Sequence, residues 1–262
     1  MVRYLRLLWM QLRVSLATAM HYRIDFLVNG AMSLWWMVWT LVPVFVVFGG
    51  RDEVAGWTLA ESLVVIAWFT LLRGFLEGAI NPSLQQLVEH IRSGTLDFVL
   101  IKPADAQFLV STAKFQPWKV VDLVAAGIIL GVAFQRLGRL PEPGDVAVAA
   151  VLLVTAALVL YSMWILVVCA AFWVVRLDNL SYLFTSIFDA ARWPLAVFRG
   201  AWRILFTFVI PLGLMTTYPA MAILGKLEAR TAALAVAGAL AFTLAARLLW
   251  TRALGRYTSA SS

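Results

Sequence analysis

Residues 146–175 read VAVAAVLLVTAALVLYSMWILVVCAAFWVV, a run of 30 residues without one charged side chain. A helix needs about 20 predominantly apolar residues to cross a membrane, so this run is long enough to span it and to tilt or project beyond it. In the whole chain of 262 residues, 63% are hydrophobic and 13% are charged. Soluble domains have about 45–50% and about 25%. The sequence therefore predicts an all-α polytopic membrane protein and excludes a soluble enzyme domain.

Further apolar runs bring the expected number of membrane spans to six. The expected spans cover about residues 26–48, 59–80, 119–135, 147–175, 204–222 and 231–250. The third is short and becomes long enough only if Asp122 sits at the membrane interface. The fifth is uncharged but is broken by Pro211 and Pro219. No room remains for a sizeable soluble domain, so residues 1–262 are expected to form one transmembrane domain.

Basic side chains predict the orientation of these spans. With both termini in the cytoplasm, 15 Lys and Arg residues fall in inner segments and 5 in outer loops. An excess of Lys and Arg on the cytoplasmic side is typical of membrane proteins, so we expect cytoplasmic termini. The net charge of +7 does not indicate a nucleic-acid partner, because the basic residues stand in small groups at the ends of apolar runs. That placement suits an anionic lipid bilayer.

The expected inner segments are much larger than the outer loops, which indicates a contact on the cytoplasmic side. Residues 1–23 are expected to form an amphipathic helix in the plane of the interface, with apolar side chains opposed to three arginines. Residues 176–203 form the second large inner segment, in which Pro194 interrupts any continuous helix. Both segments are expected to lie outside the hydrocarbon core.

The first large inner segment, residues 81–118, begins with an expected short amphipathic helix. Asn81 is its expected N-cap, Pro82 suits its first position and Gly94 its C-terminal stop. Its apolar side chains recur at i, i+3, i+4 and i+7, which places them on one face. They are Leu84, Leu87, Val88 and Ile91. The pattern leaves open whether this face rests on lipid headgroups or binds a partner.

Two features inside the expected spans each have a structural and a functional interpretation. Arg73 and Glu77 stand four residues apart near the inner end of the second span, where snorkelling and mutual pairing are sufficient to keep them. A role in gating or in partner contact is the alternative. Gly127 and Gly131 form a G-x-x-x-G pattern in the third span, which allows close helix packing. We expect that packing within one chain, with a dimer interface as the alternative.

The run SGTLDFVLIKP at residues 93–103 resembles the signature after the second span of bacterial type-2 ABC exporter permeases. The resemblance is carried by Gly94, Leu96, Asp97, Leu100, Lys102 and Pro103. A basic amphipathic N-terminal helix, six spans and the run IPLGLMTTYPA at residues 210–220 agree with it. It implies a multi-pass permease subunit of the bacterial cytoplasmic (inner) membrane.

In such a family, two permease chains, identical or paralogous, form the pathway, and two ATP-binding cassette ATPase subunits dock on short cytoplasmic coupling helices. The resemblance implies that residues 82–92 form the main coupling helix and that residues 178–188 are a second contact. The candidates for coupling to the ATPase are Leu84, Leu87, Val88, Ile91, Gly94, Leu96, Asp97, Leu100, Lys102 and Pro103. For Asp97 and Lys102, a pair that fixes the loop is the alternative.

The chain itself is not expected to be an enzyme. It contains no G-x-x-x-x-G-K-[ST] motif, so ATP and Mg are expected on a partner ATPase and no cofactor on this chain. The two histidines are isolated, so no metal site is expected. Residues 188–192 resemble a fragment of the Asp-rich motif of phosphatidyl-alcohol transferases, but the remaining metal-binding aspartates are absent.

Two further alternatives are an ion-coupled secondary transporter and a non-transporting membrane scaffold. The first is disfavoured because no internal repeat is evident and no acidic residue is expected deep in a span. The second remains open at the level of sequence. A shortage of buried charge favours a hydrophobic or amphipathic cargo for an exporter.

Overall fold

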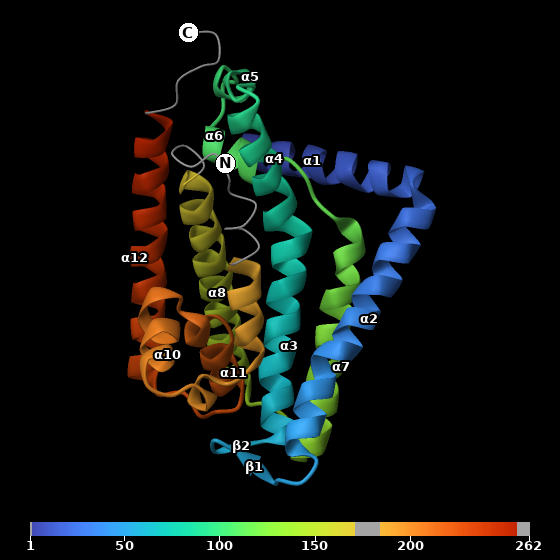
Figure 1. Cartoon of the computed structure of the whole chain (residues 1–262), viewed down its shortest axis with the longest axis vertical. Coiled ribbons are helices and arrows are strands. Elements are labelled where there is room, and N and C mark those ends of the chain that lie inside the picture. Colours follow the sequence, from blue (N-terminus) through green and yellow to red (C-terminus); the bar gives the residue numbers. More distant parts are fainter. Residues whose placement is uncertain (1, 171–183, 256–262) are drawn as a thin grey trace.

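A computed structural model describes residues 2–170 and 184–255 of the chain. Five helices in this part are long and apolar enough to cross a membrane. They are α2 (Arg23–Phe48), the helical segments Leu59–Arg92 and Pro117–Leu137, α8 (Pro143–Cys169) and α12 (Ala229–Leu254). Figure 1 shows them side by side along the long axis of the molecule. The prediction of an all-α polytopic membrane protein is confirmed.

The elements at the two ends of this bundle show which way each helix runs. One end, which we call the α1 end, carries α1 (Val2–His21), α5 (Asp97–Leu100), α6 (Ala106–Ser111) and the last turns of α12 (Figure 1). The other, the hairpin end, carries β1 (Glu53–Val54) and β2 (Trp57–Thr58), which pair antiparallel. Because α8 and α12 both run towards the α1 end, the chain between them must return to the hairpin end. This connectivity agrees with a sixth crossing.

α1 lies across the bundle axis and meets α2 at a corner (Figure 1). This orientation fits the predicted helix in the plane of the interface. Three hydrogen bonds fasten it to residues 103–115: from Arg3 to the Pro103 carbonyl, from the Asp105 N–H to the Tyr4 hydroxyl, and from the Phe115 N–H to the Ser15 hydroxyl. The helix is therefore attached to the protein as well as suited to lipid.

The second expected span and the amphipathic helix after it form one continuous rod: α3 (Leu59–Phe75), a π-helical turn η1 (Leu76–Ile80) and α4 (Asn81–Arg92). The expected helix start at Asn81 is therefore wrong. The backbone of Asn81 is helical, and its Oδ1 has no hydrogen-bond partner among the described residues. Pro82 lies inside the rod and has no N–H to offer to the carbonyl of Gly78. That carbonyl accepts instead from the N–H of Gln116, at 2.8 Å.

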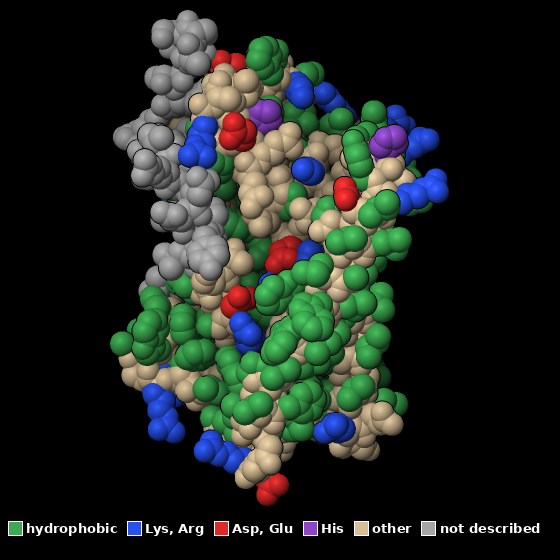
Figure 2. Space-filling model, turned by 45° about the vertical axis from the view of Figure 1, so that its right-hand side comes forward, with side chains coloured by type: hydrophobic (Ala, Val, Ile, Leu, Met, Phe, Trp, Pro, Cys, Tyr) green, Lys and Arg blue, Asp and Glu red, His purple; other side chains and the backbone are tan. Residues whose placement is uncertain are grey.

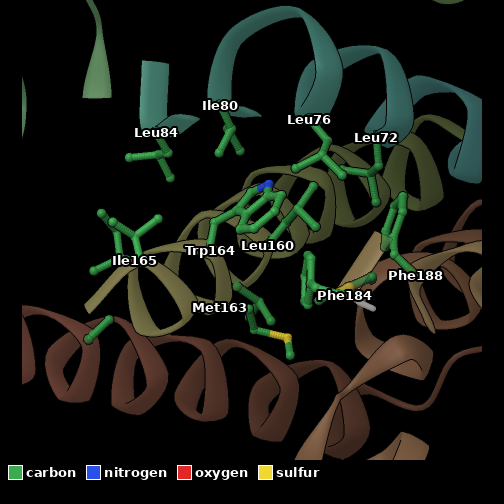
Figure 3. Close-up of a cluster of buried hydrophobic side chains, with 14 of the residues drawn as sticks. Leu72, Leu76, Ile80, Leu84, Leu160, Met163, Trp164, Ile165, Phe184 and Phe188 are labelled. Carbon is green, nitrogen blue, oxygen red and sulfur yellow. The ribbon is translucent and has the colours of Figure 1, made fainter. Parts of the chain in front are cut away.

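One face of this rod packs on α8 and forms the main apolar core (Figure 3). Trp164 of α8 is 1% exposed and lies opposite the leucines of the rod. The labelled side chains of this core are Leu72, Leu76, Ile80, Leu84, Leu160, Met163, Trp164, Ile165, Phe184 and Phe188. The last two come from residues 184–188, so the second expected inner segment contributes to the core.

The expected cytoplasmic position of residues 176–203 is wrong for the described part, residues 184–203. Phe188 packs on Phe69 of α3 with ring centroids 5.3 Å apart, and the Thr216 hydroxyl donates to the Ala191 carbonyl at 2.7 Å. These contacts place the segment among the spanning helices, where its aromatic residues find apolar neighbours. Residues 176–183 and the end of the expected fourth span, residues 171–175, lie outside the described residues.

The expected fifth span, residues 204–222, is not one helix. Residues 189–223 form a series of short elements: η4 (Asp189–Arg192), η5 (Leu195–Val197), α10 (Ala201–Ile204), η6 (Leu205–Val209), η7 (Gly213–Thr217) and α11 (Tyr218–Ile223). Pro211 separates η6 from η7, because it offers no N–H to continue the helix. Gly200 has a φ of 58° and allows the chain to turn before α10. Pro211 thus marks an interruption in this crossing, whereas Pro219 lies in the first turn of α11, which continues directly from η7.

The other face of the rod meets η2 (Pro117–Lys119) and α7 (Val120–Leu137) at close range. A Cβ placed on Gly74 would lie 2.9 Å from the Cβ of Asp122, and one on Gly78 would lie 3.0 Å from the Cβ of Lys119. Only glycine permits this approach. At the hairpin end, ion pairing between Lys226 and Glu61 at 2.6 Å ties the loop before α12 to the start of α3.

Candidate functional site

The resemblance motif forms a compact structure at the α1 end, beyond the last turn of α4. Gly94 has a φ of 68°, its N–H bonds the carbonyl of Ile91, and the N–H of Thr95 bonds that of His90. This pair of bonds is the Schellman arrangement that ends a helix, so the predicted stop at Gly94 is correct. The chain then turns into α5. There Phe98 is 68% exposed and Ile101 is 77% exposed.

The predicted coupling residues fall into two groups in the structure. Leu84, Leu87 and Leu96 are buried in the core, and Val88 and Ile91 pack against it. The apolar face of α4 is thus turned inward and anchors the helix to α8 and α6. The exposed candidates are Leu100, Lys102 and Pro103. They adjoin Phe98 and Ile101, and we call residues 98–103 the α5 surface.

A polar clamp holds the chain that follows the α5 surface. Arg247 of α12 bonds both carboxylate oxygens of Asp105, the nearer at 2.6 Å, and it also donates to Gln107. Gln107 donates to the hydroxyl of Tyr161 in α8, at 3.1 Å. The hydrogen bond from Arg247 holds the pKa of Asp105 below its usual value. The α5 surface is therefore presented from a base that is fastened to two spanning helices.

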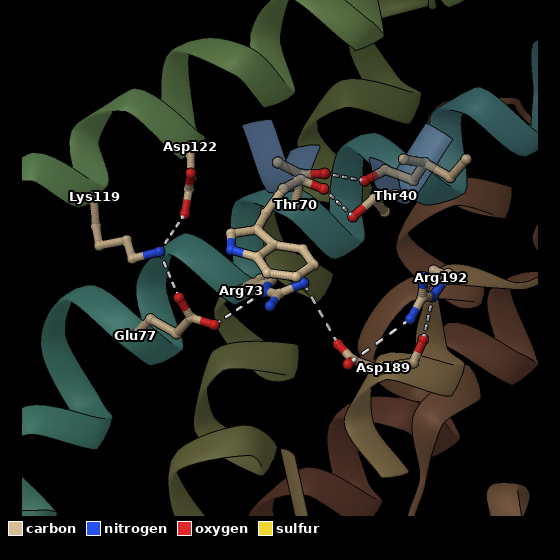
Figure 4. Close-up of polar contacts among 10 residues, drawn as sticks. Thr40, Thr70, Arg73, Glu77, Lys119, Asp122, Asp189 and Arg192 are labelled. Carbon is tan, nitrogen blue, oxygen red and sulfur yellow. Dashed lines mark hydrogen bonds and ion pairs between the residues drawn. The ribbon is translucent and has the colours of Figure 1, made fainter. Parts of the chain in front are cut away.

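Six charged side chains of alternating sign form a continuous chain across the interior, shown in Figure 4. We call it the charge network: Asp122, Lys119, Glu77, Arg73, Asp189 and Arg192. Its shortest links join Lys119 to Glu77 at 2.5 Å and Arg73 to Glu77 at 2.9 Å. Three carboxylates face three cations, so the network as a whole is neutral. It connects α7, the rod and η4.

The charge network lies deep in the bundle. Lys119 also donates to Ser33 at 3.0 Å, and Ser33 stands ten residues beyond Arg23, about 15 Å along α2. Asp122 is 6% exposed, so its carboxylate is enclosed by protein. Arg73 and Glu77 pair as expected, but they turn towards partners on η2 and η4 and do not snorkel to the surface. Acidic residues do lie deep in the protein, contrary to expectation.

A small polar cavity of about 50 Å³ adjoins the network between α2, α3 and α7. Hydroxyl groups of Ser33, Thr40 and Thr70 line it beside the charged side chains. The last two donate to their own helices, at 2.9 Å and 2.8 Å. Figure 2 shows acidic and basic side chains in a hollow on one face of the molecule, surrounded by apolar surface. The network is thus reachable from the side of the bundle.

The comparison with protein families decides the class of this membrane protein. A family model described as "ABC-2 family transporter protein" matches residues 34–261. The chain belongs to this family. No curated protein and no solved structure matches it significantly. As an ABC-2 family protein the chain is a permease subunit of an ABC transporter, a class of membrane component that associates with ATP-binding cassette ATPase subunits. The resemblance inferred from residues 93–103 is confirmed at the level of the family.

The pairing of four charged residues in this ABC-2 permease was not expected from the sequence. Lys119 and Asp122, and likewise Asp189 and Arg192, stand three residues apart with opposite charge. That spacing pairs charges on one helical face and was the available signal. The link between the two pairs runs through Arg73 and Glu77, whose partners come from distant parts of the sequence. Only the fold brings them together.

The glycine pair of the third expected span and three tryptophans of α2 lie at the surface of this ABC-2 permease. Gly127 and Gly131 are exposed, and a Cβ on either would meet nothing within 4 Å, so the expected packing of this pair within the chain is wrong. Trp35, Trp36 and Trp39 are exposed, as lipid-facing residues are. Within residues 2–170 and 184–255, no group of three His, Cys, Asp or Glu side chains is placed to hold a metal.

Proposed function

We propose that this permease subunit works in an exporter, in which two separate ATPase subunits bind the α5 surface and a second permease chain completes the pathway. The α1 end is then the cytoplasmic side, as the distribution of basic residues predicts. The cargo is amphipathic: the spanning helices offer apolar surface, and the charge network offers a polar site beside it. ATP and Mg bind to the partner ATPase.

The exposed apolar side chains of the α5 surface carry this proposal. Figure 1 places α5 beyond α1 along the bundle axis. An interfacial helix marks the boundary of the lipid, so side chains beyond it face water. Exposed apolar side chains in water mark protein interaction sites. Phe98 and Ile101 therefore have no lipid to cover them and fit a protein partner.

Co-purification with an ATP-binding cassette subunit tests this assignment. In the double variant Phe98→Asp and Ile101→Asp, recovery of the ATPase with the permease should fall at least about tenfold, since two interface anchors are lost. Leu140→Asp is the matched control, because Leu140 is 84% exposed near the hairpin end. It should leave recovery unchanged. Full recovery with the double variant would refute docking on the α5 surface.

The three acids of the charge network are the observation that favours the second candidate, ion-coupled transport. Such coupling needs a carboxylate that gains and loses its partner. Here Glu77 lies between Arg73 and Lys119, and Asp189 lies between Arg73 and Arg192. Every carboxylate of the network is thus paired, which favours the ATP-driven function. Transport in sealed vesicles that persists without ATP and follows an imposed proton gradient would establish the second candidate.

A further inference from the structure

A groove of about 500 Å³ lies under α1, between that helix, η1 and the start of α7. Three side chains of α1 line one wall: Trp9, Leu12 and Leu16. They belong to the apolar face predicted for this helix, and they remain exposed in the folded chain. The opposite walls are Phe75 and Ala79 of the rod, Phe115 to Pro117, and Val120 and Leu123 of α7.

Most side chains that line the groove are apolar, and the charged side chains among them are basic. Among the described residues that line it, none is acidic, and the basic ones are Arg13 and Lys119. The amino group of Lys119 is held by Glu77, Asp122 and Ser33, so only its aliphatic stem is offered to the groove. Arg13 is exposed and forms no hydrogen bond or ion pair with another described residue. The groove thus combines an apolar bed with one unpaired guanidinium.

The position of the groove matches the two parts of a phospholipid. α1 lies across the bundle axis, as a helix in the headgroup region does (Figure 1). A chain below α1 is therefore at the depth of acyl chains, and a group beside Arg13 is at the depth of phosphates. A guanidinium binds phosphate through two parallel hydrogen bonds. A helix of a second copy would bury Arg13 against apolar side chains, which is costly for an unpaired charge.

We propose that this groove is a binding site for an anionic phospholipid, with an acyl chain between α1, η1 and α7 and the phosphate on Arg13. The site is built by the fold, since its walls come from three elements far apart in the sequence. It does not depend on whether the permease exports its cargo. A bound lipid would fill the space that separates α1 from the rod and so set the position of α1.

Native mass spectrometry of the purified full-length chain tests the proposal. The delipidated protein is offered phosphatidylglycerol or phosphatidylcholine with the same acyl chains. The wild type should retain phosphatidylglycerol about tenfold more strongly. Arg13→Gln should remove that preference. Arg6→Gln is the matched control, because it removes the same charge from the same helix outside the groove, and it should keep the preference.

A second variant tests the apolar part of the site. Ala79→Trp fills the groove and should reduce the retention of both lipids at least about fivefold. A thermal unfolding curve like that of the wild type shows that the variant is folded. Equal retention of the two lipids by the wild type, an anionic preference that survives Arg13→Gln, or retention by Ala79→Trp at the wild-type level would each overturn the proposal. Retention lost only when two copies associate would identify a second chain as the occupant.

Discussion

The two faces of the rod, α3–η1–α4, are built in opposite ways. One face packs leucines against Trp164 of α8 (Figure 3), and the face around Gly74 and Gly78 meets the start of α7 through glycines and charges (Figure 4). Interdigitated apolar side chains resist separation because any gap forfeits contacts on both sides. Charges of alternating sign can exchange partners when elements shift. The rod is therefore held to α8 by interdigitated apolar side chains, and to the start of α7 by close backbone approach and ion pairs.

Trp164→Ala tests the apolar face and should have the largest effect. Removing a fully buried indole leaves a cavity between α8 and the rod, and the free energy of unfolding should fall by about 3–5 kcal/mol. Unfolding in detergent, followed by circular dichroism, measures the loss. Val154→Ala on the same helix is the control, since Val154 is 62% exposed. A similar small loss for both variants would show that α8 and the rod are loosely packed.

Gly74→Leu tests the close approach between the rod and α7. The added side chain collides with Asp122, so α7 must move away and the charge network must stretch. Overpacking of this kind costs about 1–3 kcal/mol. Gly127→Leu is the matched control, because a Cβ there meets nothing within 4 Å. Equal unfolding temperatures of the two variants would contradict a close contact between the rod and α7.

Glu77→Gln tests the charges between the rod and α7. The change leaves Arg73 and Lys119 without the carboxylate that joins them, and a hydrogen bond to a charged group contributes about 1.5–3 kcal/mol to stability. Because the cations can still bond Asp189 and Asp122, we expect a net loss of about 1–2 kcal/mol together with altered ATP-driven transport. Glu89→Gln, exposed on the same rod, should change neither. Transport at the wild-type rate would confine the network to a structural role.

The clamp between Asp105 and Arg247 is a polar contact at the α1 end of the bundle and should have the smallest effect. The pKa of Asp105 is lowered in the folded chain, so its contribution is complete above the ordinary pKa of an aspartate. It is lost as the pH falls through the lowered value. A partly exposed ion pair contributes about 0.2–1 kcal/mol. Unfolding of the wild type and of Asp105→Asn should therefore differ at pH 7 and converge in acid; a constant difference would exclude the ion pair as its cause.

The sequence was sufficient for the class of fold and for the family. Uncharged runs such as residues 146–175 have no other stable environment, and the motif at residues 93–103 is local in sequence. The burial of each helix was not predictable in the same way. α2 and α3 are both strongly apolar, yet α2 is mostly exposed and α3 mostly buried. In a membrane, lipid and protein present equally apolar surroundings, so hydropathy does not distinguish them.

The site was predictable only where its geometry is local. Gly94 ends its helix as expected, because the requirement for a positive φ lies within one turn. The inner position expected for residues 184–203 rested on the four arginines nearby and missed that Asp189 pairs with Arg73. When the fold alone brings two charged residues together, their positions in the sequence do not indicate that they pair. The same holds for Lys119, which stands at the end of an inner loop and acts in the interior.

The proline inside the rod has a mechanical consequence. The carbonyl of Gly78 that Pro82 leaves free is bonded to Gln116, and Lys119 three residues later is bonded to Glu77. The loop before α7 is thus attached to the rod by a hydrogen bond and an ion pair within one turn. A displacement of α4, which ends beside the α5 surface, would therefore reach the start of α7 through these two contacts near Gly78. The inner loop is long in sequence, but these contacts hold its two ends together. The length of chain between them therefore does not matter for how the rod and α7 are linked.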